Sequence, residues 1–266
     1  MTNIYMKCFY KFFFSITLWS TAFYAHSGAW TQNKGSALNI ATGQYYQSNN
    51  YWTSGGHLRS SPIYKKGYGS NYFEFGITDK LTFGGYFSGL NSYTQAGGTQ
   101  GGGNDNLILG RYQLWKNDQY VISTQLYFDA LGHGAKLNIP PQNGRFNSSE
   151  ALWIGTSGTS KEKKVNWFFD GGIAYIQRYG PGDQIQVILE SGWKFNQDRL
   201  WIFVQNYNTV GLAYPQKGSF NLFTIAPSVL VWPTKYLGLQ LGVTQDFYGQ
   251  NVGEGTGPFV ALWLTV

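Results

Sequence analysis

Apolar and polar residues alternate along most of the chain, in stretches of about ten residues. In the stretch 184–195, Ile185 and Val187 fall on one face of an extended strand, and Gln186 and Glu190 fall on the other. About ten residues is the length that a tilted β-strand needs to cross the hydrocarbon of a bilayer. The pattern therefore predicts membrane-crossing strands with one face toward lipid and the other toward water.

Twelve such stretches can be placed, and an even number is typical of bacterial outer-membrane barrels. They are 36–47, 71–77, 81–93, 105–115, 120–130, 150–160, 166–178, 184–195, 199–210, 220–232, 236–247 and 257–266. Both faces are apolar in the stretches 166–178 and 220–232, so the sequence does not decide which face of these two strands points inward. Pro227 cannot donate to a strand ladder, and we expect a bulge or bend there. The predicted fold is an all-β, antiparallel, up-and-down transmembrane barrel.

The connections between these stretches alternate in length. The short ones are 78–80, 116–119, 161–165, 196–198 and 233–235, and the long ones are 48–70, 94–104, 131–149, 179–183, 211–219 and 248–256. Short turns on one side and long loops on the other are typical of barrels whose two termini lie in the periplasm. We therefore expect periplasmic N- and C-termini and external long loops.

Composition supports a membrane barrel and argues against helical spans. Aromatic residues make up 18% of the chain and charged residues only 12%, although the average hydropathy is mildly polar. No stretch after the leader approaches the roughly 20 continuous apolar residues that a spanning helix needs. Alternating strands reconcile these facts, with most rings expected at the two rims of the bilayer.

The N-terminus has the three parts of a secretory signal peptide. A basic stretch is followed by the apolar stretch 12–25, and then by the small-residue exit Ala25-His26-Ser27. We expect cleavage after Ser27, which leaves 28–266 as one barrel domain; cleavage after Ala29 also satisfies the small-x-small rule.

The segment 72–86, with its aromatic-Glu-aromatic-Gly-x-Thr-Asp-Lys-Leu-Thr pattern, carries a family resemblance. It resembles a hairpin of small proteobacterial outer-membrane proteins described as transporters linked to meta-pathway phenol degradation. The stretches 110–115 and 174–184 are also similar to that group. The resemblance implies an outer-membrane barrel with a transport or channel role. Within the motif, Thr-Asp-Lys supplies a tight turn and Glu74 places a carboxylate on the polar face.

Polar residues on the predicted inward faces carry charges of both signs. We select as lumen-lining candidates Glu74, Arg111, Asp129, Arg178, Glu190, Lys194, Gln205, Tyr207, Gln240 and Asp246. In an open channel such groups tune selectivity, whereas in a plugged barrel they pair and fill the interior. We favour a narrow pore, because many inward residues are small. Phe203 and Trp201 share the inward face of Tyr207, which suggests a path for apolar or aromatic solutes.

Enzymatic and metal-dependent functions find little support. The only cysteine, Cys8, lies in the leader, and the histidines beyond the leader, His57 and His133, fall in predicted loops. A phospholipase barrel needs a strand histidine, and an omptin-like protease would have only Asp129 and His133. We therefore expect no catalytic residues, no metal and no cofactor.

The net charge of +6 includes two lysines of the leader and forms no basic stripe, so nucleic acid is not an expected partner. The expected function is a passive outer-membrane channel or facilitator for small solutes, with hydrophobic or aromatic ones as candidates. Expected partners are outer-membrane lipid, lipopolysaccharide, the barrel-assembly machinery and the solute. Two alternatives stay open: a surface barrel whose external loops bind a partner, and an outer-membrane lipid-modifying enzyme.

Overall fold

The computed structural model describes residues 28–94, 98–129, 148–160, 165–177, 182–195, 198–212 and 219–266. They form twelve strands: β1 (Ala37–Trp52), β2 (Leu58–Thr78), β3 (Leu81–Thr94), β4 (Gly98–Lys116), β5 (Tyr120–Asp129), β6 (Ser148–Ser160), β7 (Val165–Gln177), β8 (Gln184–Phe195), β9 (Leu200–Gly211), β10 (Phe220–Val231), β11 (Leu237–Gln250) and β12 (Val252–Thr265). Within these residues there is no helix with the length and apolarity to cross a membrane.

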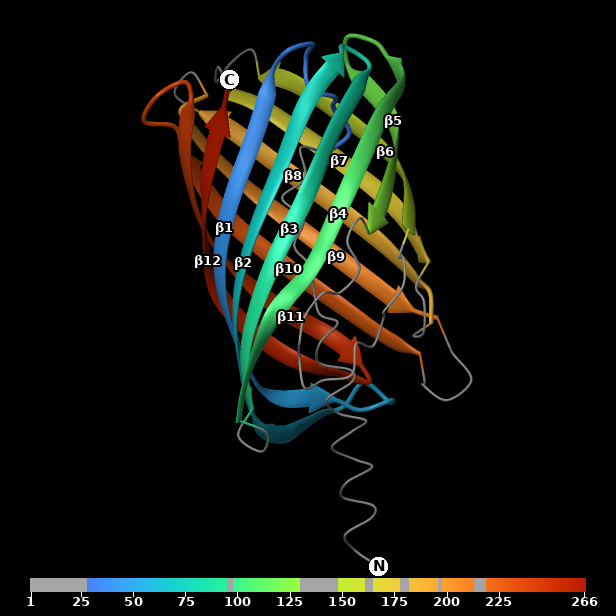
Figure 1. Ribbon diagram of the computed structural model, residues 1–266, viewed down its shortest axis with the longest axis vertical. Coiled ribbons are helices and arrows are strands. Elements are labelled where there is room, and N and C mark those ends of the chain that lie inside the picture. Colours follow the sequence, from blue (N-terminus) through green and yellow to red (C-terminus); the bar gives the residue numbers. More distant parts are fainter. Residues whose placement is uncertain are drawn as a thin grey trace, which may run out of the picture.

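Each strand pairs antiparallel with its sequence neighbours, and β1 closes the ring on β12 (Figure 1). At the seam Leu38 lies opposite Thr265, and Ala37 and Val266 exchange two backbone hydrogen bonds of 3.0 Å. No strand is left with a free edge, so the ladder satisfies the backbone groups that lipid could not. This confirms the predicted twelve-stranded up-and-down barrel.

The two faces of the strands separate as the alternation predicts. On β11, Leu239, Leu241 and Val243 are exposed on the outer wall, while Gln240 and Thr244 are buried inside. Exposed rings lie at both ends of the wall: Trp115, Tyr120, Trp193 and Tyr236 near the short turns, and Phe128, Tyr175, Phe247 and Tyr248 at the far end. An apolar belt flanked by rings is the exterior that a bilayer requires, and it places the barrel in an outer membrane.

The faces of β7 and β10, which the sequence leaves open, are now assigned. Asp170 of β7 and Ser228 of β10 are buried inside, while Ile173 and Val229 are exposed outside. The pairing register continues through Pro227, and the bulge expected there lies instead between Phe223 and Thr224.

Three of the short turns share one arrangement, in which a side-chain oxygen accepts hydrogen bonds from the backbone N–H groups two and three residues further on. Thr78, Asn117 and Thr234 each do this, over distances of 2.7–3.2 Å. Such local bonds stabilise a tight turn without any help from neighbouring strands. This explains why the short connections could be placed from the sequence.

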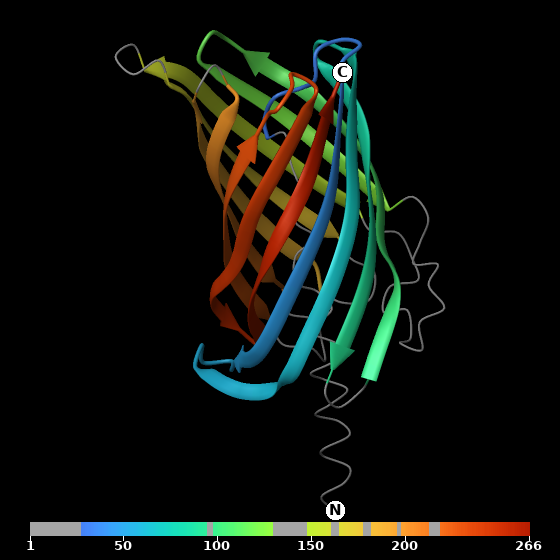
Figure 2. The ribbon, with the colours of Figure 1, turned by 90° about the vertical axis from the view of Figure 1, so that its left-hand side faces the viewer.

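For three of the long connections, the loop bounds expected from the sequence are wrong. Most of 48–70 is strand, with a tip at 53–57; β3 and β4 leave only 95–97 between them; and β11 and β12 are separated by Asn251 alone, at φ 53°. The β1–β2 hairpin extends past the barrel wall and bends at the end opposite the C-terminus (Figures 1 and 2). These extensions are polar, so hydrophobic alternation could not reveal them.

Candidate functional site: the lumen

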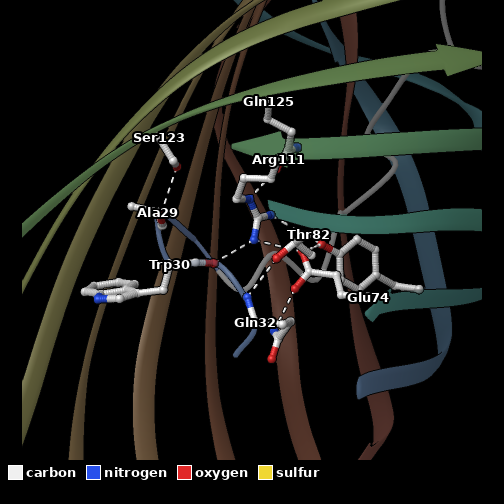
Figure 3. A network of polar contacts seen from close by, with 9 residues as sticks. Ala29, Trp30, Gln32, Glu74, Thr82, Arg111, Ser123 and Gln125 are labelled. Atoms are coloured by element: carbon white, nitrogen blue, oxygen red, sulfur yellow. Dashed lines mark hydrogen bonds and ion pairs between the residues drawn. The ribbon is translucent and has the colours of Figure 1, made fainter. Parts of the chain in front are cut away.

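Residues 28–35 are here called the inner segment. Its first part, with Ala29, Trp30 and Gln32, lies inside the barrel at the end that carries the short turns (Figure 3), and residues 33–35 are exposed. Ala29 is fully buried, and its carbonyl accepts a 2.8 Å hydrogen bond from the Ser123 hydroxyl. The Gln32 N–H donates to the Thr82 hydroxyl at 2.8 Å, and the Gln32 amide donates to Glu74 Oε2 at 2.7 Å. The inner segment is therefore held to the wall by β2, β3 and β5 together.

The β2–β3 turn holds the other half of the inner segment. Asp79 accepts hydrogen bonds from the Lys34 N–H at 3.0 Å and, through its carbonyl, from the Thr31 hydroxyl at 2.9 Å. The Gly35 N–H donates to the Gly76 carbonyl at 2.8 Å. A Cβ at Gly76 would lie 2.0 Å from the Asn33 carbonyl oxygen, so only glycine permits this approach. The motif at 72–86 is thus a docking site as well as a hairpin.

A buried ion pair joins the inner segment to the wall. Arg111 and Glu74 are both fully buried, with 2.8 Å between Nη1 and Oε1. Arg111 also donates to Gln125 at 2.7 Å and to the Trp30 carbonyl at 2.9 Å, and Tyr72 hydrogen-bonds to Glu74 (Figure 3). Burial of two charges is tolerated only where the remaining donors and acceptors are satisfied in this way.

An aromatic cluster lies at the same end of the lumen. It consists of Phe168, Trp201, Phe203, Trp232 and Trp263, with neighbouring ring centroids 5.8–6.5 Å apart, mostly edge to face. The Lys194 ammonium lies 4.0 Å from the centroid of Trp201. The rings therefore offer apolar faces beside a cation.

The far end of the lumen is polar. Asp246 accepts hydrogen bonds from the Tyr46 and Thr224 hydroxyls. The Lys66 ammonium lies 5.6 Å from the Tyr46 ring and 5.5 Å from the Tyr68 ring. Lys66 was expected in an external loop, but it belongs to β2 and is buried, because β2 is far longer than its apolar part.

A cavity of about 20 Å³ lies between these two ends, with room for about one water molecule. Its lining is Thr42, Gln44, Gln205, Tyr207, Ala226, Gln240, Thr244, Phe259 and Trp263. Amide and hydroxyl groups thus face the same space as three aromatic rings.

Most of the sequence-selected residues are buried side chains of the lumen: Glu74, Arg111, Glu190, Gln205, Tyr207, Gln240 and Asp246. Lys194 is half-buried beside the aromatic cluster. Asp129 is the last residue of β5, with its side chain outside the described residues, as is all of Arg178. The ion pair brings Glu74 and Arg111 together, and Gln205 donates to Glu190 at 3.0 Å.

Sequence reasoning missed the inner segment, Asp170 and Gln125. Asp170 lies on the strand whose two faces were both apolar, where a lone carboxylate was the only inward signal. Nothing in the local pattern of residues 28–35 indicates that they turn into the lumen, because their partners lie 42 to 94 residues further along the chain.

The described residues do not bring a catalytic or metal-binding set together. His57 lies at the tip of the β1–β2 hairpin, where its backbone N–H donates a hydrogen bond to the Thr53 hydroxyl at 3.2 Å. The proposed pair of Asp129 and His133 falls outside the side chains that can be described. In the described part of the chain, no three His, Cys, Asp or Glu residues are grouped to hold a metal ion.

Comparison by sequence finds no matching family model and no matching curated protein. Solved structures do match. The COG4313 outer membrane channel from Pseudomonas putida F1 aligns with a TM-score of 0.69 at 12% identity, over 91% of this chain and 99% of that chain. The NanC porin aligns with a TM-score of 0.55 at 10% identity, over 85% of this chain and 98% of that chain. The β domain of the Bordetella autotransporter BrkA aligns with a TM-score of 0.50 at 8% identity, over 88% of this chain and 100% of that chain. At these identities the likeness concerns the fold: this chain has the barrel architecture of outer-membrane proteins.

Proposed function

We propose that the chain is a passive outer-membrane channel for small solutes, with aromatic solutes preferred. The observation that carries the proposal is the mid-lumen cavity, where amides and hydroxyls face the rings of Tyr207, Phe259 and Trp263. A solute that leaves water needs hydrogen-bonding groups to replace its hydration, and an aromatic solute also gains from ring faces. The resemblance to phenol-degradation transporters and the fold shared with a channel and a porin agree with this proposal.

This cavity has room for about one water molecule, so a larger solute would pass through it only when groups around it move. The inner segment is the element with that freedom, because it is held by side-chain and turn contacts rather than by a strand ladder. We place the short turns and both termini on the periplasmic side, as in other barrels of this kind. The inner segment then forms the periplasmic constriction.

Planar-bilayer recording of the purified protein tests channel function directly. We expect discrete conductance steps. A protein that inserts fully folded but stays silent at every applied voltage would contradict the proposal and favour the surface-binding barrel. Lipid release from labelled vesicles, measured in parallel with and without calcium, would expose a lipid-modifying enzyme instead.

Solute preference is tested with a pair of permanently charged ions that do not cross lipid unaided. Benzenesulfonate and cyclohexanesulfonate have the same charge and similar size, so their permeability ratio in proteoliposomes reports the aromatic contribution. Replacing Phe203 and Tyr207 together by alanine should lower this ratio by about two- to tenfold, the range expected for lost ring contacts. Phe247→Ala is the matched control, because Phe247 faces outward and is 60% exposed. An unchanged ratio in the double variant would refute an aromatic path.

A further inference from the structure

One buried carboxylate of the lumen has an oxygen whose hydrogen-bonding capacity is unused among the described residues. Asp170 of β7 is 1% exposed, and its Oδ1 has no hydrogen-bond partner in the described structure. The backbone N–H of Ala29 donates a hydrogen bond to this carboxylate. A charged carboxylate buried with so few partners is costly, so a further donor or cation is to be expected at this position.

Among the described residues, the charged side chains inside the barrel are unbalanced by one. In this part of the chain the buried acids are Glu74, Asp170, Glu190 and Asp246, and the cations inside are Arg111, Lys66 and Lys194. Arg111 pairs with Glu74, Lys66 attracts Asp246, and Lys194 attracts Glu190. Asp170 is attracted by Arg111, but the ion pair of Arg111 is with Glu74. It lies close enough to Glu190 for the two to repel each other.

The backbone of Gly28 lies directly against this carboxylate. A Cβ built on Gly28 would come within 1.7 Å of Asp170 Oδ2 and 3.1 Å of Oδ1. The nitrogen of Gly28 is bonded to the same Cα, so a charge on it would lie close to this carboxylate. An amide nitrogen inside a continuous chain carries no such charge.

We propose that the missing cation is the α-ammonium created when the leader is removed. A signal peptidase of the exporting cell adds water across the Ser27–Gly28 peptide bond. The leader departs with the new carboxylate, and the Gly28 nitrogen takes a proton and pairs with Asp170. This balances the lumen charge and anchors the inner segment across the constriction.

The structure also separates the two possible cleavage sites. Cleavage after Ala29 would remove the N–H that faces Asp170 and the carbonyl that accepts the 2.8 Å hydrogen bond from Ser123. Both Asp170 and Ser123 would then be buried without these partners. Cleavage after Ser27 keeps both contacts and adds the ion pair.

N-terminal sequencing and intact mass of the protein purified from outer membranes give the first test. We expect a chain that starts at Gly28. A chain that starts at Trp30, or at any other residue, overturns the proposal.

Amine reactivity gives the second test, because the pair keeps the α-amine in its protonated, unreactive form. N-terminal-selective acylation of the folded protein should be at least about tenfold faster in Asp170→Asn than in the wild type. Asp246→Asn, which removes a buried carboxylate at the far end, should react like the wild type. Equal rates in the wild type and in Asp170→Asn overturn the pair, since burial alone would protect both.

A third measurement applies if Asp170→Asn fails to fold. The wild-type chain starting at Gly28 is refolded in lipid with a free or an acetylated α-amine, and its urea unfolding midpoint is compared. We expect the acetylated chain to unfold at lower urea, and equal midpoints would refute the ion pair.

Discussion

At the residue scale, the lumen shows how a barrel accommodates charges that neither lipid nor bulk water reaches. Arg111 has its donors taken up by Glu74, Gln125 and the Trp30 carbonyl, so its charge is buried with its hydrogen bonds made. Removing one partner of the ion pair leaves the other charge buried and unpaired, which lowers the free energy of unfolding more than removing both charges does.

Arg111→Met should therefore destabilise the folded barrel by about 3–5 kcal/mol, because it strands the Glu74 carboxylate. The double variant Arg111→Met with Glu74→Gln should lose much less, since the glutamine is neutral and can still accept from Gln32. Urea unfolding in lipid vesicles, followed by tryptophan fluorescence, measures both. A double variant as unstable as the single one would show that the ion pair is not the source of the effect.

At the scale of elements, the inner segment is a described part of the chain that lies against the inside of the barrel without belonging to its wall. It crosses the lumen at the level of the ion pair and is held by the β2–β3 turn and by β4 and β5. No strand ladder includes it, so its removal leaves all twelve strands with their partners.

A chain that starts at Lys34, expressed without a leader and refolded in lipid, should conduct more than a chain that starts at Gly28. The physical reason is that the missing residues include Ala29 and Trp30, which occupy lumen space beside Gly155. Single-channel conductance in planar bilayers is the measurement. Replacing the 53–57 tip of the β1–β2 hairpin by Asn-Gly is the control, since it alters the opposite end. Equal conductance of the two chains would mean that the inner segment does not narrow the path.

At the scale of the whole molecule, the outer wall fixes the position of the barrel in the membrane. Leu241 of β11 lies between Val229 and Val260 of the neighbouring strands, and all three are exposed on the wall. Tyr236, just before β11, is one of the exposed rings at the short-turn end of the wall. The cost of a charge on this surface should depend on its depth in the bilayer.

Leu241→Arg should destabilise the inserted barrel by about 2–4 kcal/mol, and Tyr236→Arg by no more than about 1 kcal/mol. The fraction of folded protein in vesicles, read from heat-dependent mobility in gels across a urea series, measures both. If the two substitutions cost the same, the Leu241 region is not the middle of the apolar belt.

The sequence by itself determined the number of strands, the outward faces of most of them and the positions of the short turns. These features rest on local physics: a two-residue alternation reports which side chains meet lipid, and a Thr or Asn at a fixed offset closes a tight turn. Alternation stopped being informative where both faces were apolar, as around Asp170, and where strands continued as polar hairpins beyond the belt, as around Lys66.

Only the tertiary structure decided what fills the lumen. Tyr46 and Asp246 meet across 200 residues, and the inner segment meets β5 across 94. Such pairs form because the closure of the ring brings distant strands around one enclosed space, where each buried charge must find a partner. No local pattern encodes that requirement, so the ion pair, the docked inner segment and the carboxylate of Asp170 became visible only in the folded barrel.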